Sequence, residues 1–144
     1  MKAYLKLDNQ LCFALYTANR KMTGQYKALL DPLNLTYPQY LVMLVLLEKD
    51  GITVKSLGEK LYLDSGTLTP LLKRMEKTGY VVRERSEEDE RKVLIYLSEE
   101  GRTLEASLEQ VPLKLCVDVD IEKLVQLRES LNELIDTLSC QASK

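Results

Sequence analysis

Apolar residues recur every three or four positions along most of the chain, which predicts a succession of amphipathic helices. The first runs from residue 8 to about residue 30, with Gly24 as a weak point inside it. It ends before Pro32, because the residue preceding a proline is pushed out of the helical region. A helix of about six turns at the front of a small protein needs a large partner surface. A second copy of the chain is one candidate for that surface.

A second predicted helix begins at residues 36–37, with Pro38 in its first turn. Residues 40–47 are apolar on every side, so this helix should be buried at the centre of the fold. It ends at Asp50 and Gly51, and Ile52 could form a minimal strand.

A third, shorter helix is predicted from Thr53, its N-cap, to about residue 61, and a fourth covers residues 63–77. Asp64 and Ser65 are suitable N-caps for the fourth helix, because their side-chain oxygens accept amide hydrogens of the first turn. Two short helices joined by a tight turn predict a helix-turn-helix.

The fourth helix has one apolar and one polar face, and Pro70 in its first two turns is tolerable there. Small hydroxyls come first on the polar face and cations last. The members of that face are Ser65, Thr67, Thr69, Lys73, Arg74 and Lys77. This order suits a helix whose first turn meets DNA base edges while its last turn meets phosphates. An ordinary amphipathic helix with a solvated face is the alternative.

A hairpin should follow the fourth helix, which Gly79 is expected to stop. Residues 80–85 and 92–97 alternate as strands do, and a charged turn separates them. A hairpin directly after a recognition helix is a wing, and Arg91 near its tip could enter a minor groove. Asp89 could hold Arg91 in place. The alternative is a solvated acidic tip, because acidic residues outnumber the cation.

Ser98 should cap another helix, which Pro112 bends or breaks, and Asp118 or Asp120 should cap a last one. The leucine stripe of the last helix is close to heptad spacing, which suits either a helical dimer interface or an intramolecular core. The predicted fold class is mainly α with a small β-hairpin wing. A winged helix-turn-helix at about residues 36–97 would lie between dimerisation helices at about residues 8–31 and 98–140, in a single domain 1–144.

Composition narrows the class of protein. The chain has 144 residues and a formal net charge of −2, so any DNA contact must come from local clustering of cations. It has no apolar run long enough for a membrane helix and no secretory signal, which indicates a cytoplasmic protein. It contains no His, and Cys12, Cys116 and Cys140 lack the close spacing of zinc ligands. Neither a metal nor another cofactor is expected.

The segment DSGTLTPLLKRMEKTGYVVRERSEEDERKVLIYLSEEG closely resembles the MarR family of winged-helix repressors, including the D-x-R of the wing at Asp89 and Arg91. The segments LDNQLCFALY, QYKALLDPLNLTYPQYLVML and YLDSGTLTPLLKRME resemble the organic hydroperoxide resistance regulators (OhrR) of that family. The resemblance implies a non-enzymatic homodimer that binds near-palindromic double-stranded operator DNA. It assigns DNA contacts to Ser65, Thr67, Thr69, Arg74 and Arg91.

The same resemblance maps the family's sensor cysteine onto Cys12. A thiol reacts as its thiolate, and the residues around Cys12 give mixed support for that form. A position in the first turns of a helix favours that form, whereas Asp8 one turn earlier disfavours it. A small buried apolar cysteine is the alternative.

In the branch that the chain resembles, tyrosines matching Tyr16, Tyr26 and Tyr37 surround the cysteine, and the hydroxyls of the last two bind it. An organic hydroperoxide would oxidise Cys12 to a sulfenic acid, which a second thiol converts to a disulfide. By resemblance, that thiol is Cys116 of the other subunit or a low-molecular-weight thiol. Cys140 has no expected role.

Three hypotheses follow. The first is a peroxide-sensing repressor, and the second is a MarR-type repressor released by a small aromatic ligand. The third, a thiol peroxidase, is disfavoured because a turnover enzyme needs a base or cation beside its thiol. The chain has no His, and Arg20 and Lys21 are the only cations in the middle of that helix. The family that the chain resembles also contains broader thiol-based redox and virulence regulators.

Overall fold

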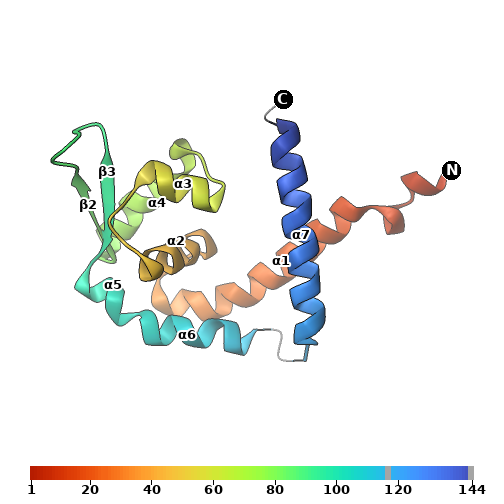
Figure 1. The fold of residues 1–144 in the computed structure, drawn as a ribbon. Helices are drawn as coiled ribbons and strands as arrows, with labels where there is room; N and C mark the ends of the chain where they lie inside the picture. The colour runs from red at the N-terminus through yellow and green to blue at the C-terminus, as the bar shows by residue number, and fades with distance from the viewer. Residues whose placement is uncertain (116–117, 143–144) are drawn as a thin grey trace. The chain divides into compact units, whose positions relative to one another are not determined.

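A computed structural model describes residues 1–115 and 118–142 (Figure 1). The chain divides into two compact units, Met1–Pro112 and Leu113–Lys144. The elements of the first unit are the short 3-10 helices η1 (Ala3–Leu5), η2 (Leu7–Asn9) and η3 (Asp31–Leu33), the helices α1 (Leu11–Leu30), α2 (Tyr37–Glu48), α3 (Val54–Leu61), α4 (Ser65–Thr78) and α5 (Glu99–Thr103), and the strands β1 (Ile52–Thr53), β2 (Val81–Arg85) and β3 (Val93–Leu97). Helix α6 (Glu105–Lys114) crosses the division, and α7 (Ile121–Ala142) forms most of the second unit. The predicted fold class is confirmed.

The three strands form one antiparallel sheet in the order β1-β3-β2. Val81 lies opposite Leu97 and Arg85 opposite Val93, so β2 and β3 make the predicted hairpin. This hairpin extends away from the helices around it (Figure 1). The minimal strand expected at Ile52 is also present and pairs with Ile95.

Helix α2 lies at the centre of the first unit, but it is not buried on every side as its apolar run predicts, because Leu44 is 38% exposed. Its start is fixed by a capping box, in which Gln39 N–H donates to the Thr36 hydroxyl and the Gln39 side chain accepts from Thr36 N–H. Val42 and Met43 are fully buried and Leu46 nearly so. They belong to a core that also contains Leu57, Leu68, Leu72, Met75 and Ile95. The helix-turn-helix and the sheet are therefore built on one apolar centre.

The helix-turn-helix depends on a close approach of two backbone segments. Leu63 N–H donates to Gly58 O at 2.9 Å. A Cβ atom at position 58 would lie only 2.6 Å from Leu63 O, so glycine is required there. Tyr62 has a left-handed backbone with φ of 56°, which turns the chain from α3 toward α4. Thr53 and Asp64 cap the two helices as predicted.

The start of the first helix differs from the sequence prediction. Helix α1 begins at Leu11 rather than at Asp8, which lies in η2. The side chains of Asn9 and Gln10 donate to Ala3 O and Tyr4 O at 2.7 and 2.6 Å, and these local bonds hold 3-10 turns instead. Asp8 is thus outside the helix of Cys12.

In the C-terminal part, the helix expected to start at Ser98 is divided at Leu104 into α5 and α6. Pro112 does not break α6, which continues to Lys114. Asp120, rather than Asp118, meets the first turn of α7, accepting from Glu122 N–H at 3.0 Å.

Candidate functional site

The polar face of α4 is open to solvent. Ser65, Thr67, Lys73 and Arg74 are exposed and Thr69 is half-buried, whereas Leu68, Leu72 and Met75 on the opposite face are buried. Pro70 lies inside the helix without ending it, and Gly79, with φ of 97°, stops it as predicted. The packing of α4 therefore leaves hydroxyls at its start and cations further along available to a partner.

Asp64 fixes the first turn of this helix. Its carboxylate accepts from Thr67 N–H at 2.7 Å. Hydrogen bonds from the Thr67 backbone and side chain, with a further one from Gly66 N–H, lower the pKa of Asp64. An ionised cap then holds Ser65 and Thr67 in a fixed first turn.

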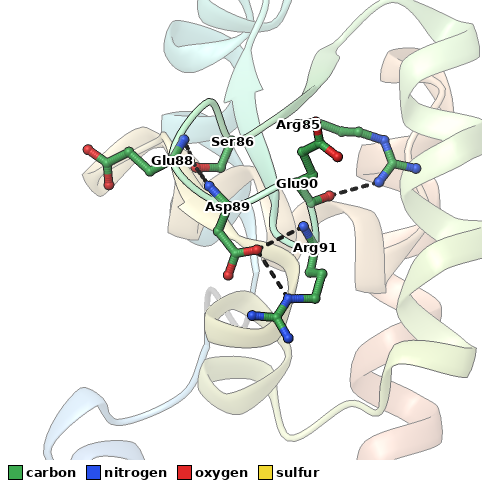
Figure 2. A network of polar contacts seen from close by, with 6 residues as sticks. All are labelled: Arg85, Ser86, Glu88, Asp89, Glu90 and Arg91. Carbon is green, nitrogen blue, oxygen red and sulfur yellow. Dashed lines mark hydrogen bonds and ion pairs between the residues drawn. The ribbon is translucent and has the colours of Figure 1, made fainter.

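The wing tip contains the expected pair of Asp89 and Arg91 (Figure 2). Asp89 Oδ1 accepts from the backbone N–H of Arg91 at 3.0 Å and from its Nε at 3.3 Å. The Ser86 hydroxyl accepts from the backbone of Asp89 at 3.3 Å, and Arg85 donates to Glu90 O at 2.9 Å. The Arg91 side chain is 91% exposed, so the network orients it without covering it.

Cys12 is the second residue of α1 and is exposed, which departs from the alternative of a small buried cysteine. Tyr16, one turn later, is also exposed. The Arg20 guanidinium lies 4.8 Å from the centre of the Tyr16 ring, a cation–π contact. The first half of α1 thus carries a thiol, a phenol and a cation on successive turns.

Tyr26, Tyr37 and Tyr40 form a compact aromatic cluster between the end of α1 and the start of α2. The Tyr26 ring centre lies 4.7 Å from that of Tyr37 and 5.5 Å from that of Tyr40. Burial raises the pKa of Tyr40, and the neighbouring Tyr37 adds to the rise. The apolar run that begins at Tyr40 predicts a core position for this residue but not its place beside the two predicted tyrosines.

Within one chain, the tyrosine cluster lies far from Cys12. Fourteen residues of continuous helix separate Cys12 from Tyr26, a rise of about 21 Å. Cys116 lies outside the described residues, and Cys140 is an exposed free thiol on α7. Among the predicted redox residues, the structure joins Tyr26 with Tyr37 and leaves Cys12 with Tyr16 at the other end of α1.

Within residues 1–115 and 118–142, no helix is both long and apolar enough to cross a membrane. The same residues contain no group of three or more His, Cys, Asp or Glu side chains that could hold a metal ion.

Comparisons with known proteins agree with the fold. Residues 25–108 match the family model described as transcriptional regulator SarA/Rot. The organic hydroperoxide resistance transcriptional regulator of Bacillus subtilis (strain 168) is 55% identical over 138 residues, covering 94% of this chain and 93% of that protein.

Solved structures of AbfR, a protein of Staphylococcus epidermidis, are also similar. Reduced AbfR bound to DNA is 38% identical with a TM-score of 0.75, covering 89% of this chain and 93% of that chain. Overoxidized AbfR bound to DNA is 36% identical with a TM-score of 0.76, covering 93% and 98%. Disulfide-formed AbfR is 36% identical with a TM-score of 0.68, covering 90% and 92%.

The helix-turn-helix, its exposed polar helix and the hairpin that follows define a winged-helix DNA-binding protein. The sequence identity to the relatives, and the share of each chain that it covers, also identify the family. The chain belongs to the MarR family of transcriptional regulators, in the branch of the organic hydroperoxide resistance regulators. The family predicted from the sequence is confirmed.

Proposed function

We propose that this chain is a cytoplasmic, homodimeric repressor that leaves its operator when an organic hydroperoxide oxidises Cys12. The observation that carries the proposal is the exposed thiol of Cys12 on α1. It is supported by the name of the Bacillus subtilis relative and by the reduced and overoxidized forms of AbfR, both of which are bound to DNA.

A dimer would cover apolar side chains that one copy leaves exposed. In the first unit these lie on the N-terminal segment and the first turns of α1, and they are Tyr4, Leu5, Leu7, Leu11 and Phe13. In the second unit, Leu127, Ile135 and Leu138 on α7 are exposed. Apolar stripes of this kind are typical of helical subunit interfaces. We propose that both chain ends serve dimerisation and that the whole chain acts as one functional domain.

The helix geometry supports a redox site shared between two subunits. Tyr26 and Tyr37 of one subunit would approach Cys12 of the other, because about 21 Å of α1 separates them within a chain. Their hydroxyls would donate hydrogen bonds to the sulfur, which stabilises a thiolate. Tyr16 would stand beside the thiol from its own helix.

The reaction we propose has two steps. The Cys12 thiolate attacks the terminal oxygen of the hydroperoxide, an S–O bond forms and the O–O bond breaks. Cys12 then carries a sulfenic acid, and the departing alkoxide takes a proton from water to become an alcohol. A second thiol then displaces the sulfenic oxygen as water and forms a disulfide. Cys116 of the other subunit or a low-molecular-weight thiol would supply it. The overoxidized form of AbfR is bound to DNA, which favours the disulfide as the releasing state.

On DNA, the two α4 helices would enter successive major grooves. Ser65, Thr67 and Thr69 would meet base edges, and Lys73 and Arg74 would meet phosphates. Arg91, held by Asp89, would enter the flanking minor groove. A disulfide at Cys12 would move α1 and α2, change the spacing of the two α4 helices and weaken binding.

The test is binding of the reduced protein to the DNA upstream of its own gene, before and after cumene hydroperoxide. Wild type should lose binding and regain it with dithiothreitol, and Cys12→Ser should bind under both conditions. Cys116→Ser reports on the second thiol, and Cys140→Ser is the matched control at another exposed cysteine. If Cys12→Ser were released like wild type, the sensor assignment would be wrong.

A further inference from the structure

A cleft of about 450 Å³ lies between the start of α3, the first half of α4 and the outer part of the hairpin, next to its tip. Its polar lining residues are Thr53, Lys55, Thr69, Arg83, Arg91 and Lys92. Four of these are cationic, and the described residues contribute no acidic side chain to the lining. In a chain of net charge −2, this is a local concentration of positive charge.

The fold brings these cations together from distant parts of the chain. Strand β1 pairs with β3 so that Thr53 lies opposite Leu94. Lys55 lies in the first turn of α3, directly after β1, and Lys92 lies directly before β3, so that both lysines line the cleft. The sequence predicts no DNA contact for either lysine.

The four cations are not equally available. Arg83 Nε lies 3.3 Å from Glu76 Oε1, and Arg91 Nε lies 3.3 Å from Asp89 Oδ1. Lys55 and Lys92 are exposed, and within the described part of the chain neither forms an ion pair. They are the uncompensated charges of the cleft.

The position of the cleft suggests what it binds. Thr69 belongs to α4, which faces the major groove in a winged-helix complex, and Arg91 belongs to the wing, which faces the adjacent minor groove. The phosphate backbone that separates two adjacent grooves must pass between the elements that enter them. Cations at that crossing would neutralise phosphates.

We propose that this cleft seats a phosphate of the DNA backbone, with Lys55 and Lys92 as its ligands. The inference rests on the proposed DNA binding. The contact carries no base information, so it fixes the register of α4 and the wing on the duplex. Each lysine occurs twice in a dimer, and each neutralised phosphate contributes about 0.9 to the slope of log K against log salt.

The experiment measures the salt dependence of binding to the upstream DNA and to a scrambled duplex. Lys55→Ala and Lys92→Ala should each reduce the slope, and the double variant should reduce it by about two, with the operator-to-scrambled ratio unchanged. Lys55→Arg and Lys92→Arg should keep the slope. Lys49→Ala removes an exposed lysine outside the cleft and should also keep it. Thermal melting of every variant checks that the fold is intact.

Slopes for Lys55→Ala and Lys92→Ala equal to that of Lys49→Ala would overturn the proposal, and so would a collapse of the operator-to-scrambled ratio. Inorganic phosphate at matched ionic strength should inhibit binding no more than chloride. Stronger inhibition that disappears in Lys55→Ala would show a small-anion site instead. Failure of wild type to prefer its upstream DNA would contradict the proposed function, whereas the scrambled duplex would still test the phosphate seat.

Discussion

The rings of Tyr26 and Tyr37 lie 4.7 Å apart, one at the end of α1 and the other at the first residue of α2. This contact ties the two helices together at a point far from the thiol of their own chain. It would link the proposed redox site to the fold, since α2 lies in the core on which the helix-turn-helix is built.

Replacing these hydroxyls should slow oxidation without unfolding the protein. Tyr26→Phe and Tyr37→Phe keep the ring contact but remove hydrogen bonds to a charged sulfur. Each such bond stabilises by about 1.5–3 kcal/mol, so sulfenic acid formation should slow about ten- to hundredfold. Trapping with dimedone followed by mass spectrometry measures the rate. Tyr40→Phe, from the same cluster but buried, is the control and should react at the wild-type rate.

Mixed dimers should reveal whether the site is shared. A Cys12→Ser subunit paired with a Tyr26→Phe/Tyr37→Phe subunit retains one complete site if the tyrosines act across the interface. Half of the sites, counting two per dimer, should then react at the wild-type rate. If thiol and tyrosines acted within one chain, no rapid phase would remain, and the shared site would be excluded.

The wing should depend more on Arg91 than on its partner. Arg91→Ala should weaken operator binding about tenfold or more, because it removes the exposed cation of the tip. Asp89→Asn should cost at most about fivefold, since exposed ion pairs contribute at most about 1 kcal/mol. Glu88→Gln is the control, because its side chain points away from this pair (Figure 2). Equal losses for all three variants in a fluorescence anisotropy assay would argue against a specific wing contact.

Two glycine substitutions should have opposite effects on the free energy of unfolding. Gly58→Ala places a Cβ atom 2.6 Å from Leu63 O and should destabilise by about 1–3 kcal/mol. Gly24→Ala meets no described atom within 4 Å and should stabilise α1 by about 0.5–1 kcal/mol. Urea unfolding at one protein concentration compares them. If Gly58→Ala left the free energy of unfolding unchanged, the backbone of the helix-turn-helix would be able to move away from the added Cβ atom without cost.

Alkaline pH should destabilise the fold partly through Tyr80. Burial, with a smaller effect of Glu100, raises the pKa of Tyr80 above its ordinary 10.0. Above about pH 10, the Tyr80 hydroxyl loses its proton more readily in the unfolded chain than in the folded protein. The free energy of unfolding therefore falls as pH rises. Tyr80→Phe should make this fall shallower.

The same variant removes the hydrogen bond from the Tyr80 hydroxyl to Leu33 O, at 2.6 Å. It should therefore lose about 1–2 kcal/mol at about pH 8. Urea unfolding at about pH 8 and above pH 10 measures both effects. An equally steep alkaline loss in Tyr80→Phe would place the responsible group elsewhere, for example at Tyr40, whose pKa is also raised.

Local signals made much of the fold predictable. Asp64 and Gly79 mark the two ends of α4 through capping and a left-handed backbone, both of which depend on residues close in sequence. The alternation in β2 and β3 likewise needed no tertiary information. The start of α1 was missed because Asn9 and Gln10 bond carbonyls six residues away, which periodicity does not register.

The site was predictable only in part, because its contacts join distant segments. Tyr26 and Tyr37 could be connected to Cys12 only by family resemblance, and helix geometry then separates them within one chain. The neighbourhood of Lys55 and Lys92 depends on the register of β1 against β3. A two-residue strand gives too weak a pattern to predict that register from sequence.

The most direct test of the account follows Cys12 and DNA in the same sample. Reduced wild-type protein on its upstream DNA is titrated with cumene hydroperoxide, while mass spectrometry reports the oxidation state of Cys12 and anisotropy reports the bound fraction. The account predicts that DNA is released in proportion to Cys12 disulfide and that dithiothreitol reverses both. Release without oxidation of Cys12, or full retention of DNA when Cys12 is entirely in a disulfide, would contradict it.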